Sequence, residues 1–395
     1  MRKAIIEQKE YLLRQMNPQY HAFYKLYDAK HDRPETRMRT TYTASALWTL
    51  LQMHEFKPDP RIAARITPIA DYLLSMQVQD GKGKGAFHYS FDTSTKEKEL
   101  CFVGSTAKTV FTLLELYRRT GEKRYLTAAQ NAGKWLSSRV KRDGRVYPVL
   151  LWSKTKKRWS RVSKQSVLYS SETLSALSQL HLTKKNRRFA RAAGRIAERL
   201  VAQAVASNFL LGDDFRHPNS ISTSWLSMAF LDYAQINPEP KFSNAIFGAA
   251  QSLVNLQLKD PKNALDYGRY SDTLASSGNG WINEVFIQVY QRCLKMRRND
   301  CTGYAKAMNR GTRWLIQNIY SPENSYHIPN PQRARGGSIR DSKEETVRTD
   351  AVCHGGNSSV GVLGLPGVSL SMQLSDTDQA PVPVEQVGRT KSRRR

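Results

Sequence analysis

Three carboxylates stand near the starts of segments whose apolar residues recur at helical spacing. They are Glu172, Glu284 and Asp350. Hydrolysis of a glycosidic bond needs one carboxyl group to protonate the leaving oxygen and a second to act as base or nucleophile. These three residues are therefore the candidates for the two roles of a glycoside hydrolase.

Cations, a tyrosine and histidines stand at similar places and suit a different reaction. Elimination from a uronic acid, or its epimerisation, needs a cation that neutralises the sugar carboxylate and a Tyr or His that removes the adjacent proton. Arg348 is the candidate cation, and Tyr169, His217 and His354 are the candidate bases. The spacing of these residues does not decide between the two reactions.

Further residues near the same starts are candidates, with Arg348, for binding a substrate, because aromatic rings offer stacking surfaces to sugars. These candidates are Arg39, Tyr42, His88, Tyr89, Asp92, Trp152, Asn279 and Trp281. Each position also suits an ordinary helix N-terminus, where Ser170, Ser222 and Asp350 are good caps and early acids complement the helix dipole. Only the convergence of acids, aromatics, His and Arg favours a site.

Helical hairpins are the elements that must bring these residues together. Residues 101–136 show one complete unit, in which Ala107 and Val110 belong to one apolar face and Tyr125 and Trp135 to a second face after a Thr-Gly break. The first helix is apolar nearly all round, which is typical of a buried inner helix. The second has a polar face, which is typical of an outer helix.

Similar inner helices are expected at six places, separated by about 50 to 70 residues, enough for two helices and a loop. They start near Thr41, Gly104, Ser170, Ser222, Gly278 and Thr349. Because such a hairpin cannot bury its own apolar face, the copies must pack on one another, and six copies favour a closed ring. A helix over residues 5–16 would complete the glycine-rich sixth pair, and a polar, basic loop is expected to follow it as far as residue 39.

The repeated unit resembles that of the (α/α)6 toroids, the six-hairpin glycosidase-like proteins, whose relatives include polysaccharide lyases, uronyl epimerases and terpenoid cyclases. The phrase GSTAKTVFTLLELYRRTGEKRYLTAAQNAGKWL carries the resemblance, and SSETLSALSQL and GNGWINEVFIQVY are similar to its inner helix. The resemblance implies an all-α toroid over residues 40–364, with a central cleft lined by the starts of the inner helices. Residues 1–39 form a separate N-terminal helix and loop in this division, and the polar residues 365–395 predict a disordered basic tail.

The charge of the chain is strongly positive. With 61 Lys and Arg against 34 Asp and Glu, its formal net charge is +27, and such a surface attracts polyanions. Residues 143–164 predict an inserted short hairpin with a basic loop from Lys154 to Lys164, interleaved with Trp152 and Trp159, which suits anionic sugars or single-stranded nucleic acid. A solvated loop explains the same residues. We expect an anionic saccharide as the partner in preference to nucleic acid.

Cysteine spacing and hydropathy indicate the environment of the protein. The four cysteines are too few and too scattered for a disulfide scaffold or a zinc site, so reduced thiols, no metal and no cofactor are expected. The first residues lack the apolar run of a signal peptide, and no stretch approaches the about 20 apolar residues of a membrane span. The sequence therefore predicts a soluble, cytoplasmic protein, and it gives no indication of the oligomeric state.

Two other functional classes stay open. The segment QVQDGKGKGAF resembles the Gln-Gly-aromatic repeat of terpenoid cyclases, but the chain lacks their DxDD run. A non-catalytic toroid that holds a polyanion or another protein needs no catalytic pair. The preferred interpretation is a carbohydrate-active toroid that acts on an acidic polysaccharide or oligosaccharide, by hydrolysis or by uronate elimination or epimerisation.

Overall fold

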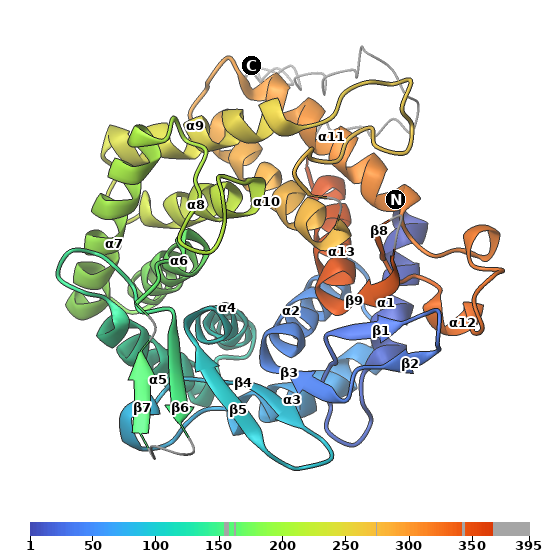
Figure 1. The fold of residues 1–395 in the computed structure, drawn as a ribbon, viewed down its shortest axis with the longest axis horizontal. Helices are drawn as coiled ribbons and strands as arrows, with labels where there is room; N and C mark the ends of the chain where they lie inside the picture. The colour runs from blue at the N-terminus through green and yellow to red at the C-terminus, as the bar shows by residue number, and fades with distance from the viewer. Residues whose placement is uncertain (154–157, 162, 274, 342–343, 366–395) are drawn as a thin grey trace, which may run out of the picture.

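Helical hairpins form a closed ring in the computed structural model, which describes residues 1–153, 158–161, 163–273, 275–341 and 344–365 (Figure 1). The inner helices are α2 (Thr40–Phe56), α4 (Val103–Thr120), α6 (Val167–Thr183), α8 (Ser220–Tyr233), α10 (Ser276–Lys295) and α13 (Thr349–Leu363). Each inner helix packs on the next, and α13 packs on α2, which closes the ring. The predicted (α/α)6 toroid is thus confirmed.

A second layer of helices surrounds the first. It consists of α1 (Arg2–Gln15), α3 (Pro60–Ser75), α5 (Lys123–Arg139), α7 (Arg187–Ala206), α9 (Pro240–Leu256) and α11 (Cys301–Gln317). The first of these, α1, packs against α13, so the start of the chain completes the sixth pair as the sequence predicted. The division of the chain at residues 39 and 364 stays a prediction.

The two layers differ in sequence because they differ in burial. On α6, small hydroxyl residues such as Ser171 and Ser175 are buried together with the leucines, and small side chains let the inner helices approach closely. On α7, Phe189 and Ile196 lie on a buried stripe whereas Arg191 is exposed. This is the amphipathic pattern of a helix with one face in water.

The glycine-rich inner helix α13 is regular because its glycines admit close neighbours. A Cβ atom at Gly356 would lie 2.5 Å from Cε of Met53 on α2, and one at Gly361 would lie 2.7 Å from Cδ1 of Ile287 on α10. Tertiary packing therefore overrides the weak helix propensity of this segment.

Two antiparallel sheets lie at the mouth of the ring where inner helices begin (Figure 1). One contains, in this order, β3 (Arg37–Arg39), β4 (His88–Asp92), β5 (Lys98–Phe102), β6 (Val149–Ser153) and β7 (Arg158–Arg161). The other has the order β2 (Arg33–Pro34), β1 (Leu26–Asp28), β9 (Glu344–Arg348) and β8 (Ile339–Asp341). Because β3, β5 and β9 lead directly into α2, α4 and α13, the sheets help to hold these helix starts in place.

The strands confirm one expectation and correct another. The predicted hairpin within residues 143–164 is confirmed as β6 and β7. The expected loop before residue 39 is wrong, since it contains β1, β2 and β3. The sequence could not reveal this, because β1 pairs with β9 from the far end of the chain, with Tyr27 opposite Val347. The short helical segments η1 (Gly81–Gly83), η2 (Pro322–Asn324) and α12 (Pro331–Ala334) lie in loops.

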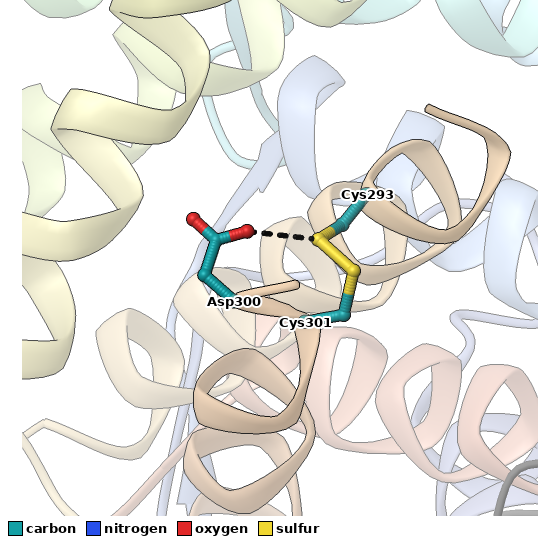
Figure 2. A group of neighbouring side chains, drawn as sticks. All are labelled: Cys293, Asp300 and Cys301. Carbon is teal, nitrogen blue, oxygen red and sulfur yellow. Dashed lines mark hydrogen bonds between the residues drawn. A yellow bond between two sulfur atoms is a disulfide. The ribbon is translucent and has the colours of Figure 1, made fainter. Parts of the chain in front are cut away.

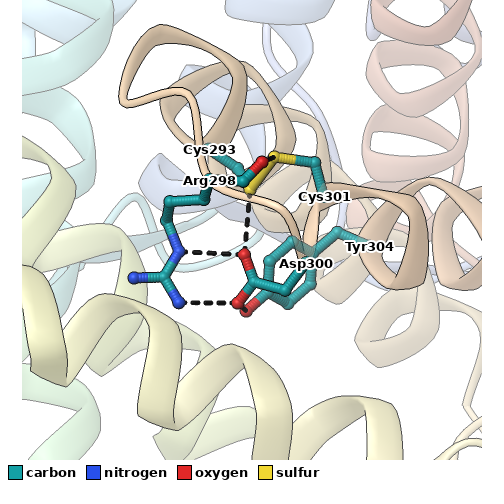
Figure 3. Close-up of a disulfide and its surroundings, with 5 residues drawn as sticks. All are labelled: Cys293, Arg298, Asp300, Cys301 and Tyr304. Carbon is teal, nitrogen blue, oxygen red and sulfur yellow. Dashed lines mark hydrogen bonds and ion pairs between the residues drawn. A yellow bond between two sulfur atoms is a disulfide. The ribbon is translucent and has the colours of Figure 1, made fainter.

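A disulfide joins the end of α10 to the start of α11 (Figure 2). Cys293 and Cys301 are 8 residues apart, and the hairpin brings their Cα atoms to 5.6 Å. Asp300 lies beside the bridge, 3.4 Å from Sγ of Cys293, and accepts two hydrogen bonds from Arg298 at 2.9 and 2.6 Å (Figure 3). The expectation of reduced thiols is therefore wrong for this pair, because antiparallel helices bring together cysteines that match no sequence motif. Cys101 and Cys353 are free and buried.

Some predictions fall outside the described residues. These include residues 154–157 and 162 of the basic loop from Lys154 to Lys164, the side chain of Trp152 and nearly all of the predicted tail. Among the described helices, none is both long enough and apolar enough to span a bilayer.

Candidate active site

A cavity of about 330 Å³ lies at the mouth of the ring, where five inner helices of the described chain present their first turns. Its charged and aromatic lining comprises Lys108, Glu172, Arg216, Trp225, Trp281, Arg348, Asp350 and His354. A smaller cavity of about 110 Å³ shares Trp225, Trp281 and His354 with it and adds Glu284 and Asn357. Ring closure thus brings together residues that are far apart in the sequence.

Glu284 and His354 form a hydrogen-bonded pair between α10 and α13. Nδ1 of His354 lies 2.5 Å from Oε1 of Glu284, and Nδ2 of Asn357 donates to Oε2 of Glu284 at 3.3 Å. The ring of Trp281 stands edge-on to the imidazole, with 5.4 Å between the ring centroids. Because Nδ1 is engaged by the carboxylate, the orientation of the ring is fixed and Nε2 is the nitrogen left for chemistry.

Arg348 and Asp350 form a partly buried ion pair at the start of α13. Nε of Arg348 donates to Oδ1 of Asp350 at 3.0 Å, and a terminal nitrogen donates to Oδ2 at 2.6 Å. The same guanidinium donates to the hydroxyl of Tyr42 at 3.1 Å. Burial opposes ionisation of Asp350, but the guanidinium of Arg348 holds the pKa of this carboxyl below its usual value. Asp350 is therefore an ionised carboxylate with both oxygens engaged.

Glu172 has the opposite environment. Burial raises the pKa of its carboxyl to about 7, although Lys108 and Arg216 act to lower it. Its Oε2 atom is buried and has no hydrogen-bond partner among the described residues. The carboxyl lies against α4, where a Cβ atom at Gly104 would be only 2.5 Å from Oε2. Glu172 is thus a carboxylic acid that keeps its proton in a large fraction of molecules near neutral pH.

Tyr169 lies one helical turn before Glu172. A Cβ atom at Gly104 would also come within 2.7 Å of the Tyr169 ring. The side chains of Tyr169 and Glu172 therefore both pack against α4 at Gly104. Burial raises the pKa of the Tyr169 hydroxyl to about 12. This hydroxyl therefore stays protonated at neutral pH. Tyr169 is not among the residues that line the two cavities, and its role as a base stays a prediction.

Two tryptophans form a stacked platform in the cavity. The rings of Trp225 and Trp281 have centroids 3.9 Å apart and planes inclined by 20°. Nζ of Lys108 lies 5.3 Å from the ring centroid of Trp225, and Nε1 of Trp281 is buried without a hydrogen-bond partner in the described part of the chain. A flat aromatic surface beside a cation and a spare donor suits an anionic sugar.

Sequence reasoning did not identify Lys108, Arg216 and Trp225. The repeat held a usable signal for Trp225, because it follows the predicted start at Ser222 at the same distance as Trp281 follows Gly278. Equivalent positions of neighbouring copies face the same opening in a closed ring. No comparable pattern marks Lys108 or Arg216.

Several predicted residues lie elsewhere or are engaged in the local fold. His217 is exposed in the loop before α8. Asn279 is buried, where its Oδ1 accepts from the amide of Tyr270 and its Nδ2 donates to the carbonyls of Thr273 and Ala275. Asp92 accepts hydrogen bonds in the turn between β4 and β5. A role in catalysis or binding for each of these residues stays a prediction.

The remaining predicted residues belong to the β3–β4 region. The guanidinium of Arg39 pairs with Glu35 and lies 5.0 Å from the ring centroid of Tyr89. The backbone carbonyl of His88 accepts from Oγ1 of Thr40 at 2.5 Å, which ties β4 to the first residue of α2. These contacts support the rim of the mouth.

One group of potential metal ligands occurs in the described residues. It consists of Cys293, Asp300 and Cys301. None of the three lines either cavity of the mouth, and both sulfurs are joined in the disulfide. Bonded to each other, these sulfurs are not thiolate ligands.

Comparisons with known proteins agree with this architecture. Residues 66–211 match the model of the ulvan lyase N-terminal domain, a span that includes Lys108, Tyr169 and Glu172. No curated protein sequence is significantly similar to the chain.

Several solved structures with similar folds are enzymes of carbohydrate chemistry by their descriptions. Cellobiose 2-epimerase from Bacillus thermoamylovorans has a TM-score of 0.67 at 11% identity and covers 89% of this chain and 95% of its own. Unsaturated glucuronyl hydrolase from a Bacillus species, described as responsible for glycosaminoglycan degradation, has a TM-score of 0.67 at 10% identity, with 95% and 99% covered. An α-mannanase from Bacteroides thetaiotaomicron has a TM-score of 0.66 at 14% identity, with 91% and 95% covered. The class is thus that of the (α/α)6 toroids.

Proposed function

We propose that the protein is an enzyme that cleaves an acidic polysaccharide by β-elimination at a uronate residue. The observation that carries the proposal is the His354–Glu284 pair in the same opening as the buried Glu172, whose pKa burial raises to about 7. The match of residues 66–211 to a lyase domain and the fold shared with a glucuronyl hydrolase support a uronate substrate.

Each step has a residue placed for it. Nε2 of His354 takes the proton from the carbon that bears the uronate carboxylate, while Glu284 stabilises the imidazolium. The electron pair of that bond forms the carbon–carbon double bond and expels the glycosidic oxygen. Glu172 gives its proton to this oxygen. The products are a new chain end and an unsaturated uronate, and both catalytic groups then exchange protons with water.

The substrate carboxylate needs a cation while the proton leaves. Arg348 lines the cavity but is already paired with Asp350. Lys108 and Arg216 also line it. Lys108 has no ion pair among the described residues, and Arg216 has only a longer contact of 3.5 Å with Asp213. The stacked Trp225 and Trp281 support the sugar ring.

Hydrolysis is a second candidate because one specific observation favours it. Glu172 has a raised pKa and Asp350 a lowered one, and such a separation is how two carboxyls serve as acid and base in one site. It is the weaker candidate, because Arg348 engages both oxygens of Asp350.

The experiment is a panel of uronate-containing and neutral polysaccharides, assayed for reducing ends and for the 4,5-unsaturated chromophore. We expect both signals with uronate polymers, and a loss of about 10² to 10⁴ in rate for His354→Ala. The matched control is His31→Ala, because His31 also pairs with a carboxylate, at 2.8 Å from Asp28, but is exposed and outside the cavity.

The outcomes separate the candidates. Reducing ends without the chromophore would establish hydrolysis and overturn elimination. Binding of uronate polymers without turnover would instead identify a non-catalytic toroid. Equal losses in His354→Ala and His31→Ala would show that the pair in the cavity has no special role.

A further inference from the structure

A groove of about 750 Å³ lies on the outside of the ring and shares no lining residue with the cavities of the mouth. It is lined by α7 from Arg191 to Ala206 and by Arg142 and Asp143 in the turn after α5. Figure 1 shows α7 on the outer wall, with α5 beside it. We call it the α7 arginine groove.

Arginines form a row along this groove. Arg191, Arg195 and Arg199 follow one another at four-residue spacing, so they share one face of α7 about 6 Å apart along the axis. Like charges at this spacing destabilise an isolated helix. A row of this kind therefore costs stability unless an anion lies against it.

The acids of the groove do not neutralise this row. Asp143 is paired with Arg145 at 2.7 Å, and Glu198 is paired with Lys241 at 2.8 Å. In the described part of the chain, Arg142 and the three arginines of the row have no acidic side chain within salt-bridge distance. In addition, Nε of Arg195 is shielded from solvent and has no hydrogen-bond partner there.

The opposite wall of the groove is fixed by Gly144. It has φ of 80°, and a Cβ atom there would lie 2.1 Å from the carbonyl oxygen of Arg195. Only glycine fits this backbone conformation at such a close approach. The turn therefore holds Arg142 beside α7 and makes the groove a preformed feature of the ring.

We propose that the α7 arginine groove binds an acidic polysaccharide outside the catalytic cavity. Guanidinium groups bind carboxylates and sulfates through two parallel hydrogen bonds. Among the described residues, no aromatic side chain lines the groove, so these residues offer no stacking surface of the kind that binds single-stranded nucleic acid. The choice of a uronate polymer rests on the proposed function, whereas the anion-binding groove does not.

The position of the groove suits a long chain. Outer helices run antiparallel to inner ones, so the end of α7 and the turn after α5 both lie toward the side where the inner helices begin. A polymer that enters the mouth can continue over the rim onto this wall. The groove would thus retain long chains and have no effect on short ones.

The test measures binding of chondroitin sulfate chains in a His354→Ala background, so that no polymer is consumed. The triple variant Arg191→Ala, Arg195→Ala, Arg199→Ala should bind about tenfold more weakly, with a shallower dependence on salt. The matched control is Lys123→Ala, Lys184→Ala, Lys185→Ala, which removes the same charge from exposed positions at the opposite end of the ring.

Affinity is also compared with that for a single-stranded DNA of equal charge. An equal loss in both triple variants, or no loss in either, would overturn the groove as a site. Tighter binding of DNA than of the polysaccharide to the groove would overturn its assigned occupant. Because these readouts need no turnover, they stay valid even if the proposed elimination fails.

Discussion

Glu172 is the most informative single residue, because its buried Oε2 has no hydrogen-bond partner among the described residues. Its role as a general acid requires the protonated form, and burial raises its pKa to about 7. We therefore expect kcat/KM on a uronate polymer to fall as the pH rises through about 7. A pH profile of the parent enzyme checks this, and a rate that stays constant up to about pH 9 would contradict an acid role for Glu172.

The same carboxyl should also cost stability at neutral pH. Between about pH 4.3 and 7 the unfolded chain has lost this proton while the folded protein keeps it, so stability falls as the pH rises through this window and levels off above it. The variant Glu172→Gln lacks the ionisable carboxyl, so its stability does not have this pH dependence. We expect its stability relative to the parent to improve by about 2.5 kcal/mol from pH 5 to pH 8.

Urea unfolding at both pH values measures this difference. Glu115→Gln is the control, because Glu115 forms exposed ion pairs with Arg118 and Arg119 on the same ring. If Glu172→Gln is simultaneously inactive and more stable at the higher pH, the carboxyl is kept for chemistry rather than for folding.

The residues of the mouth were only partly predictable from sequence. Glu172, Glu284, Asp350 and His354 could be proposed because each stands at the start of a recognisable inner helix. The pairing of His354 with Glu284 depends on which neighbours meet in the closed ring, and a list of helix starts does not contain that information. His217 shows the converse, since a position before an inner helix does not ensure access to the cavity.

At the scale of elements, the contact between α4 and α6 sets the position of the acid. Gly104→Ala would place a methyl group 2.5 Å from Oε2 of Glu172 and 2.7 Å from the Tyr169 ring. We expect the displacement of these side chains to lower kcat/KM by about tenfold to a hundredfold. Steady-state kinetics measures this loss.

Gly303→Ala is the matched control for this substitution. Gly303 is an exposed helical glycine on α11 with nothing within 4 Å of an added Cβ atom. It should keep full activity and gain about 0.5 to 1 kcal/mol of stability from the better helix propensity of alanine. Full activity in both variants would show that Gly104 has no part in positioning Glu172.

The helices were predictable for a physical reason that does not extend to the strands. A hairpin unit repeats its apolar pattern locally, so residues 101–136 reveal both layers of the ring. The strand β1 pairs with the two-residue strand β2 nearby and with β9 near the other end of the described chain, where Val347 lies opposite Tyr27. No local pattern encodes the pairing with β9. The glycines of α13 predicted a poor helix, but in the structure they allow α13 to pack closely against α2 and α10.

At the scale of the whole molecule, the disulfide bears on where the protein resides. Disulfides persist mainly in oxidising compartments, so the bridge between Cys293 and Cys301 opposes the expectation of a cytoplasmic protein. That expectation stays a prediction. It can be tested by fractionation of the source cells with an antibody against the chain.

The bridge should also stabilise the ring. Cys293→Ser with Cys301→Ser should lower the free energy of unfolding by about 2 kcal/mol, since a short closed loop is released. Thermal unfolding with and without reductant measures it. The parent should respond to reductant and the double variant should not, while Cys101→Ser, which changes a free buried thiol, should leave the response to reductant intact.

The sixth pair of the ring joins the two ends of the described chain, since α1 packs on α13. During synthesis α1 leaves the ribosome well before α13, and at about 5 to 20 residues per second the interval between them is tens of seconds. Until then the apolar faces of α1 and α2 have no partner on that side. The nascent chain therefore exposes apolar surface of the kind that holding chaperones bind, and we expect a polypeptide truncated before α13 to be unable to close the ring.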